Sequence, residues 1–378
     1  MPTSPGRPDD VGNRDRAVDR LKVLLAAGVI ITHGAITYGM PGGWFYRESD
    51  DPGILATILL VPLLVGALFA MGAFFFVAGC FVPAALARRG VGRFAADRAL
   101  RLGIPVAAFV LVVVPTIDVV VARVAGPPRS PGSVLTDQLR ELDTGPLWFA
   151  AVLLLASLAV AAGSRATGRV PRPRPLTPGV LWGAGTLVAI SSFLLRIPFA
   201  AGSQQIGSLH VWQWGQCLVL FGLGVRSGRD GLAPLDRRFS RGCRWTAVVA
   251  AVAAIGLVAA YSAEGATLDG GVHGPAALLA LVEGVLAVAG TVTALELCRE
   301  RRWAWIDRRA ADAFGAYVAQ APVLVGVGLL LRPLPLTGSP KLLVLVAVAL
   351  PACFAIPPLL RRVRGAGPSA ADAPAAAG

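Results

Sequence analysis

Two ionisable side chains in the first long apolar segment, Lys22 and His33, carry the clearest chemical signal in the chain. They are eleven residues apart, about three turns of an α-helix, so both side chains are expected on one helix face. Along the axis they would lie about 16 Å apart, with the ammonium group near one membrane surface and the imidazole near mid-bilayer. An ionisable group at that depth is costly, and histidine transfers protons readily near neutral pH. We therefore predict that His33 is a general base.

The composition places this helix in a membrane protein. Of 378 residues, 55% are hydrophobic and 15% are charged, and the mean hydropathy is +0.66, which lies outside the range of soluble domains. Apolar runs of membrane-spanning length predict an all-α, polytopic fold with about ten transmembrane helices. The expected spans cover residues 21–40, 55–86, 102–122, 146–162, 179–200, 211–225, 245–262, 275–298, 311–331 and 341–360.

The cations are concentrated in alternate loops. The N-terminal segment and every second loop hold 28 of the 35 Lys and Arg residues by our count, and the opposite loops hold seven. The positive-inside rule then places both termini in the cytoplasm, and we expect a multi-pass protein of a bacterial inner membrane. Because these cations flank spans, lipid headgroups account for the net charge of +13, and no nucleic-acid partner is expected.

A pair of arginines lies at the cytoplasmic start of the third expected span. Arg98 and Arg101 are three residues apart and would share a helix face, and Pro105 falls in the first turns, where a missing N–H costs little. Desolvated cations at this surface bind phosphate well, which makes the pair a candidate anion site. A role as plain interface anchors is the alternative.

Glu283 lies in the middle of the eighth expected span. A carboxylate at this depth must pair with a cation, take up a proton or face a wet cavity, so we predict a functional group or the partner of an arginine. His33 has a structural alternative too, as a neutral imidazole hydrogen-bonded within the bundle. Trp148 is typical of an interfacial aromatic anchor and is also a candidate substrate contact.

The sequence indicates neither a metal site nor a permanently bound cofactor. The five cysteines are scattered and form no CxxC pair. The ends of the chain, about residues 1–16 and 365–378, are rich in Pro, Asp, Ala and Gly and are expected to be disordered. This leaves residues 17–364 as one membrane domain.

Taken together, these residues resemble a known family. The spacing Asp19-x-x-Lys22-x10-His33 resembles the first-helix signature of the acyltransferase 3 family of integral membrane acyltransferases. The resemblance covers residues 17–364. Within the family, the chain is similar to the subset that includes the glucan succinyltransferases. The other matching segments, in order, are Phe74-Phe75-Phe76-Val77-Ala78-Gly79, Arg98-x-x-Arg101 with Pro105, Gly145-Pro146-Leu147-Trp148-Phe149, Phe221-Gly222-Leu223-Gly224, and Glu283 with Arg299 through Arg302.

The resemblance implies transfer of an acyl group from cytoplasmic acyl-CoA to a hydroxyl of a carbohydrate, glycolipid or small secreted molecule. His33 would take the proton of that hydroxyl. The donor phosphates would meet Arg98, Arg101 and Lys22. Glu283 would orient the imidazole or hold an arginine, and Tyr317, Gln320 or an arginine would stabilise the oxyanion.

One departure concerns the ninth expected span. The family subset often reads Tyr-x-x-His-x-Pro there, whereas this chain reads Tyr317-Val-Ala-Gln320-Ala-Pro322. Glutamine donates and accepts hydrogen bonds but does not carry a proton at neutral pH. A catalytic role for the missing histidine would leave this protein impaired, whereas an orienting role could be served by Gln320.

Two other classes of protein fit the same residues. Buried Lys, His, Arg and Glu side chains in ten spans also suit a proton-coupled carrier, although the sequence shows no convincing internal repeat. An acyltransferase relative that has lost catalysis is the other alternative, and Gln320 alone suggests it.

Overall fold

The structure is a computed structural model that describes residues 8–126, 129–203, 205–229, 232, 235–263, 268, 270–301 and 303–365. Its regular structure is helical, apart from an isolated parallel bridge between Tyr38 and Ser49, which confirms the predicted all-α class. Of the two ends expected to be disordered, residues 1–7 and 366–378 lie outside the described residues, and the first helix begins at Pro8.

The chain forms a series of helices joined by turns and loops. The α-helices are α1 (Pro8–Thr37), α2 (Ile54–Cys80), α3 (Val82–Arg98), α4 (Ile104–Ala108), α5 (Val114–Val124), α6 (Pro131–Glu141), α7 (Trp148–Thr167), α8 (Pro178–Arg196), α9 (Trp214–Ser227), α10 (Arg237–Ala263), α11 (Gly274–Glu300), α12 (Ala304–Arg309), α13 (Ala313–Leu331) and α14 (Gly338–Gly365). Two π-helical segments, η1 (Ala99–Gly103) and η2 (Phe109–Val113), join α3, α4 and α5.

Nine helical segments in the described part of the chain are long and apolar enough to cross a membrane. The sixth predicted span, 211–225, forms the helix α9, but this helix has only 14 residues and falls short of that length. Its limits have a local cause. His210 before it has φ 50° and Gly228 after it has φ 54°, so right-handed helix cannot continue in either direction. The polytopic membrane architecture is confirmed with this correction.

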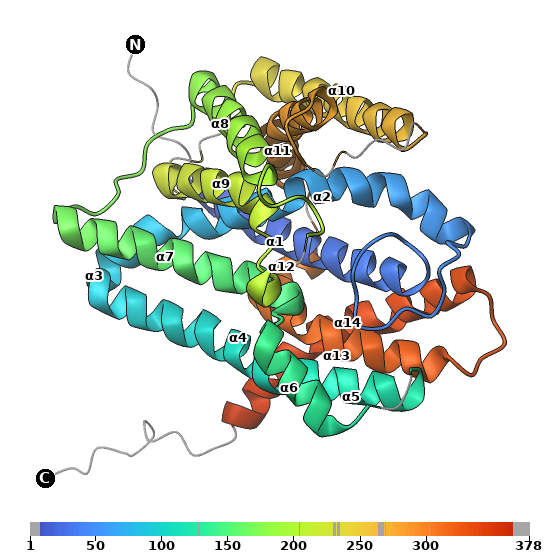
Figure 1. Cartoon of the computed structure of the whole chain (residues 1–378). Coiled ribbons are helices and arrows are strands. Elements are labelled where there is room, and N and C mark those ends of the chain that lie inside the picture. The colour runs from blue at the N-terminus through green and yellow to red at the C-terminus, as the bar shows by residue number, and fades with distance from the viewer. Residues whose placement is uncertain are drawn as a thin grey trace, which may run out of the picture.

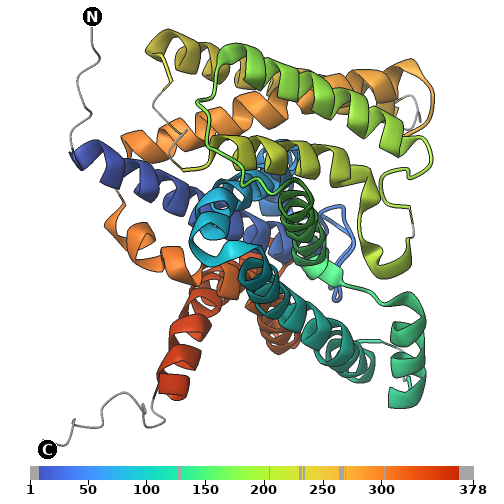
Figure 2. The same ribbon diagram turned by 90° about the vertical axis from the view of Figure 1, so that its left-hand side faces the viewer.

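Helix α1 lies at the centre of the bundle (Figure 1), where it packs against α2, α11, α13 and α14. Helices α8, α9, α10 and α11 gather on one side of α1, and α13 and α14 lie on the other (Figure 2). More than half of the apolar stretch of α1 is therefore buried inside the protein, although Leu24 keeps an exposed side chain. This position makes α1 suitable for holding a polar group at membrane depth.

Glycines allow α2 and α9 to cross at close range. A Cβ atom at Gly79 would overlap the carbonyl oxygen of Phe221, and one at Gly224 would overlap that of Phe76. Small residues permit such backbone contact between membrane helices. Two sequence segments that resemble family motifs, 74–79 and 221–224, thus meet at this crossing.

The third span widens twice into π-helix. Pro105 and Pro115 lack the N–H groups that would bond to the carbonyls of Arg101 and Leu111, four residues earlier. Both carbonyls fall in the π-helical segments η1 and η2, where the widened turn relieves the clash with the proline ring. Arg101 is therefore displayed from a π-helical turn and not from the regular α-helix that its spacing predicts.

Candidate active site

His33 and Gln320 meet where α1 packs against α13. His33 Nδ1 lies 3.0 Å from Gln320 Oε1. Because this oxygen can only accept, Nδ1 carries the proton, and Nε2 keeps a free lone pair. Gln320 has no exposed surface, whereas His33 is only partly buried. The sequence predicts both residues as candidates, and the structure brings them together.

Trp44 completes the surroundings of the imidazole. The loop between α1 and α2 folds back over α1, and the Trp44 ring stacks on His33 with centroids 4.2 Å apart and an interplanar angle of 11°. Two buried N–H donors next to the imidazole, Trp44 Nε1 and Gln320 Nε2, have no hydrogen-bond partner among the described residues. Their hydrogen-bonding capacity is unused in the structure, so a substrate oxygen that reached either group could accept from it.

Tyr317 lies one helical turn from Gln320 in α13. Its hydroxyl donates to the carbonyl oxygen of Pro146, and its ring makes edge contacts with Phe149 at 5.4 Å and Phe74 at 6.0 Å between centroids. The hydroxyl is therefore already used to join α13 to the start of α7. Of the groups suggested for oxyanion binding, Gln320 keeps a free donor and Tyr317 does not.

Trp148 is buried and not at a lipid-exposed edge. Its ring stacks on His210 with centroids 4.9 Å apart. His210 Nδ1 lies 2.5 Å from the carbonyl oxygen of Ser208, and burial lowers the pKa of this histidine, so it stays neutral at pH 7. A contact between Trp148 and substrate remains a prediction.

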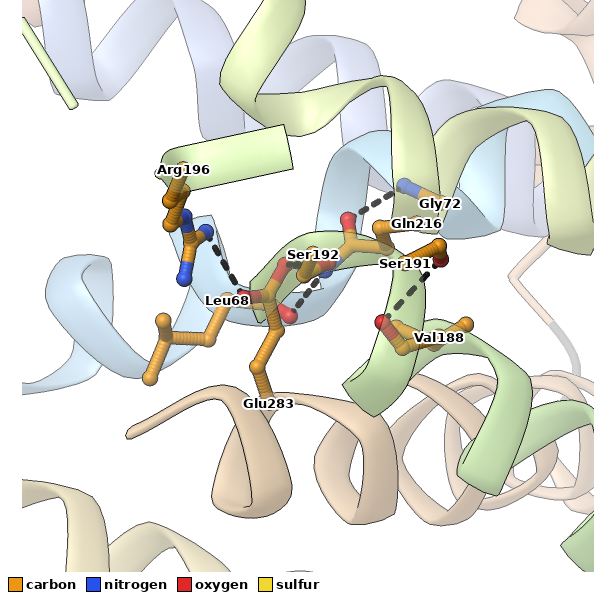
Figure 3. Close-up of polar contacts among 8 residues, drawn as sticks. All are labelled: Leu68, Gly72, Val188, Ser191, Ser192, Arg196, Gln216 and Glu283. Carbon is orange, nitrogen blue, oxygen red and sulfur yellow. Dashed lines mark hydrogen bonds and ion pairs between the residues drawn. The ribbon is translucent and has the colours of Figure 1, made fainter. Parts of the chain in front are cut away.

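Glu283 belongs to a different polar group, shown in Figure 3. Its Oε2 lies 2.7 Å from Arg196 Nη2, and its Oε1 accepts from Ser192 Oγ at 3.4 Å and Gln216 Nε2 at 3.2 Å. Arg196 and Glu283 are both buried. Of the two roles expected for Glu283, the structure shows that it holds an arginine, while Gln320 provides the hydrogen bond to His33.

Gln216 links this group to the backbone of α2. An α-helix pairs the N–H of Gly72 with the carbonyl of Leu68. Here Gly72 N–H donates to Gln216 Oε1 at 2.8 Å, and Gln216 Nε2 also donates to the Leu68 carbonyl. A Cβ atom at Gly72 would lie 2.7 Å from Gln216 Cγ, so the insertion requires glycine. The Glu283 group therefore anchors the helix that carries the aromatic run 74–76.

Lys22 forms an ion pair with Asp19, three residues earlier in α1, with Nζ and Oδ1 2.6 Å apart. Its ammonium group also lies 5.0 Å from the centre of the Phe81 ring, and the Arg229 guanidinium lies at the same distance from that ring. Two cations thus meet at one aromatic ring, eleven residues before His33 along α1. The sequence analysis did not include Arg229 in the site.

Arg98 and Arg101 contact other neighbours. The Arg98 guanidinium lies 5.3 Å from the centre of the Phe94 ring, and Arg101 Nε donates to Asp97 at 2.8 Å. The Arg101 side chain is 67% exposed. These contacts group the two arginines with α3 and not with Lys22.

The α1–α2 loop is also held in place by an ion pair. Lys341 of α14 pairs with Glu48, and Tyr46 donates to the same carboxylate at 3.2 Å. Burial, together with the Glu48 charge, raises the pKa of Tyr46 to about 12, so its hydroxyl remains a donor throughout the physiological range. These contacts hold the loop that carries Trp44.

No group of three or more His, Cys, Asp or Glu side chains suited to a metal ion occurs among the residues that the structure describes. The five cysteines are free and buried. The polar groups around His33 are the amide of Gln320 and the indole N–H of Trp44, which are suited to hydrogen bonding.

A comparison with known protein families decides the class. The family model described as an acyltransferase domain, that of acyltransferase 3, matches residues 15–357. The chain belongs to the acyltransferase 3 family. This acyltransferase is a transferase of groups other than aminoacyl groups and a multi-pass membrane protein. The match gives no support to the glucan succinyltransferase subset. No curated protein and no solved structure matches the chain.

Sequence reasoning about this acyltransferase missed Trp44, Arg196 and Gln216. Arg196 had a usable signal, because it is an ionisable residue inside the apolar segment 179–200. Trp44 had none, since an aromatic residue in a loop near a membrane surface is ordinarily an interfacial anchor. Only the fold of the loop brings it to His33.

Proposed function

We propose that this enzyme transfers an acetyl, succinyl or similar acyl group from cytoplasmic acyl-CoA to a hydroxyl of a glycan, glycolipid or small secreted molecule. The observation that carries the proposal is the hydrogen bond from His33 Nδ1 to Gln320 Oε1. It leaves Nε2 as a proton acceptor on a partly exposed imidazole in the central helix.

The reaction needs one base that later acts as an acid. His33 Nε2 takes the proton of the acceptor hydroxyl while that oxygen forms a C–O bond to the thioester carbonyl carbon. The carbonyl electron pair moves to its oxygen, giving a tetrahedral oxyanion. When this collapses, the C–S bond breaks and the CoA thiolate takes the proton from His33. The products are an ester, free CoA and neutral imidazole.

Gln320 has two functions in this scheme. Its Oε1 selects the His33 tautomer with a free Nε2. Its unpaired Nε2–H group is a buried donor beside the base, suited to the developing oxyanion. A histidine at position 320 is then not required, because neither function needs a group that changes its protonation state.

The donor would approach from the cytoplasmic end of α1. Two pairs of cations would meet the CoA phosphates. One pair is Lys22 and Arg229, which share the Phe81 ring, and the other is Arg98 and Arg101 on the third span. The asymmetry of the cations favours this face as the cytoplasmic one, with both termini on it and the protein in a bacterial inner membrane. Tyr317 and Trp148 would line the acceptor side.

We assign to Glu283 a positioning role. Its carboxylate is occupied by Arg196, Ser192 and Gln216, and through Gln216 it fixes α2. The helix α2 places Phe74 against Tyr317. Glu283 would thus act on the acyl-transfer site through the aromatic wall and not through a proton.

The test uses membranes that contain the full-length protein, supplied with radiolabelled acetyl-CoA and, separately, succinyl-CoA. We expect release of free CoA and labelling of a glycan or lipid fraction, and His33→Ala should lower the rate about 10²- to 10⁴-fold. His273→Asn is the matched control, because it keeps an N-cap acceptor for α11 outside the site. Undiminished turnover by His33→Ala would remove His33 from the mechanism.

A further inference from the structure

We propose that Trp44 is a positioning residue that stabilises the protonated form of His33 during acyl transfer, through the face of its indole ring. The inference rests on the proposed function, in which His33 takes a proton from the acceptor. It assigns a role to a loop residue that no sequence pattern identifies.

The geometry is that of a face-on contact. The two ring centroids are 4.2 Å apart, and the planes differ by 11°. A cation within about 6 Å of an aromatic centroid is attracted by the negative ring face, and tryptophan gives the strongest attraction. An imidazolium at the position of His33 would lie within this range. The neutral imidazole gains much less, so the contact favours the charged state that forms during the reaction.

The hydrogen-bond and stacking partners of the His33 ring carry no negative charge that would compensate the imidazolium. In the part of the chain that the structure describes, the ring contacts of His33 are Gln320 and Trp44, and both are neutral. Charged groups on the packed helices with partners of their own include Glu283 with Arg196 and Lys341 with Glu48. The Tyr317 hydroxyl is bonded to the Pro146 carbonyl. His210 also acts electrostatically on His33, and a positive charge on it would oppose the imidazolium and not stabilise it.

Firm support of the indole ring allows a weak attraction to matter. Phe45 packs against Trp44 and Phe109, with centroids 5.3 and 6.3 Å away. Arg47 donates to the Met40 carbonyl at 2.7 Å, which closes the loop. Because the indole is already in place, little conformational entropy is lost when the charge forms. Cation–π attraction is also larger where water is excluded.

The first experiment weakens the ring face without changing its shape. Fluorinated tryptophans carrying one to four fluorine atoms are placed at position 44 by nonsense suppression, and kcat is measured with acetyl-CoA. We expect log kcat to fall steadily with fluorine number, with a total loss in the range of about 2- to 30-fold and little change in donor KM. The same series at Trp245, which is 67% exposed, is the control and should leave kcat unchanged.

The second experiment supplies a replacement charge. Gln320→Glu puts a carboxylate at the atom that now accepts from His33 Nδ1, so the imidazolium gains an anionic partner. Trp44→Leu should then cost less in the Gln320→Glu background than in the native one. A purely structural tryptophan would give equal losses in both backgrounds.

A third readout does not depend on turnover. The purified protein, labelled with ¹⁵N-histidine, is titrated in detergent, and the His33 signals are identified by difference from His33→Ala. Fluorination of Trp44 should move the midpoint of the His33 titration to lower pH. An unmoved midpoint, or a kcat that is flat across the fluorine series in an enzyme that still requires His33, would overturn the role of Trp44 alone. Turnover without His33 would instead overturn the proposed function.

Discussion

His33 Nδ1 and Gln320 Oε1 lie 3.0 Å apart, although 287 residues separate them in the chain. The contact exists because α1 and α13 pack together at the centre of the bundle. It sets the proton of the His33 imidazole on one nitrogen and leaves the other nitrogen open. A neutral amide is sufficient for this task, since a tautomer is selected by a hydrogen bond and not by a charge.

Removing the hydrogen bond to His33 should impair the chemical step. We expect Gln320→Leu, which keeps the volume but loses both polar atoms, to lower kcat about 10²-fold with a small change in donor KM. Gln320→His restores a ring nitrogen that can accept from Nδ1 and should retain most activity. Initial rates over a range of acetyl-CoA concentrations in membranes provide the measurement, and equal activity of Gln320→Leu and the native enzyme would contradict the assignment.

Features that depend on local spacing and hydropathy could be predicted from the sequence. The ion pair of Lys22 with Asp19 follows from three-residue spacing on a helix and is present. The need for a charge partner of Glu283 follows from its position in the middle of an apolar segment, and Arg196 is that partner. The helical class and the places of the spans follow from apolar runs.

Features that depend on tertiary contacts could not be predicted. The return of the α1–α2 loop to His33 depends on the pairing of Glu48 with Lys341, residues at distant places in the chain. The short α9 depends on a left-handed conformation at His210, which single-residue preferences do not specify. The backbone insertion of Gln216 into α2 has no signature in either helix.

The crossing of α2 and α9 should tolerate no added methyl group. Gly79→Ala or Gly224→Ala would press a Cβ atom into backbone of the opposite helix, so we expect a loss of about 1–3 kcal/mol in the free energy of unfolding. Gly222→Ala is the matched control in α9, because a Cβ atom there meets nothing within 4 Å. Thermal unfolding of detergent-purified variants measures the difference. Equal melting temperatures for Gly222→Ala and Gly224→Ala would argue against the close crossing.

The buried ion pair of Arg196 and Glu283 should be far more sensitive to loss of one partner than an exposed pair. Arg196→Met leaves a carboxylate in the bundle without its cation, and we expect a cost of about 3–5 kcal/mol in the free energy of unfolding. Adding Glu283→Gln should recover part of the lost free energy of unfolding, since the amide keeps an acceptor for Gln216 and Ser192 and carries no charge.

An exposed pair gives the comparison for this measurement. Arg244 and Glu300 are 35% and 53% exposed, and Arg244→Ala should cost no more than about 1 kcal/mol. Unfolding by SDS in mixed micelles ranks the variants. If Arg196→Met and the double variant were equally unstable, the unpaired charge of Glu283 would not be the cause of the loss in the free energy of unfolding.

Cations at the donor end should affect donor affinity and leave acceptor affinity unchanged. Arg101 is largely exposed and contacts Asp97 through Nε, so its guanidinium keeps donors for a phosphate. We expect Arg101→Ala to raise the KM for acetyl-CoA about tenfold, the loss of one charge-assisted hydrogen bond, and to leave the acceptor KM unchanged.

Arg93→Ala is a control, because it removes an exposed cation from the same helical segment. High salt should narrow the gap between Arg101→Ala and the native enzyme, since screening weakens an exposed charge contact. An unchanged donor KM in Arg101→Ala at low salt would place the phosphates elsewhere, with Lys22 and Arg229 at the Phe81 ring as the next pair to substitute.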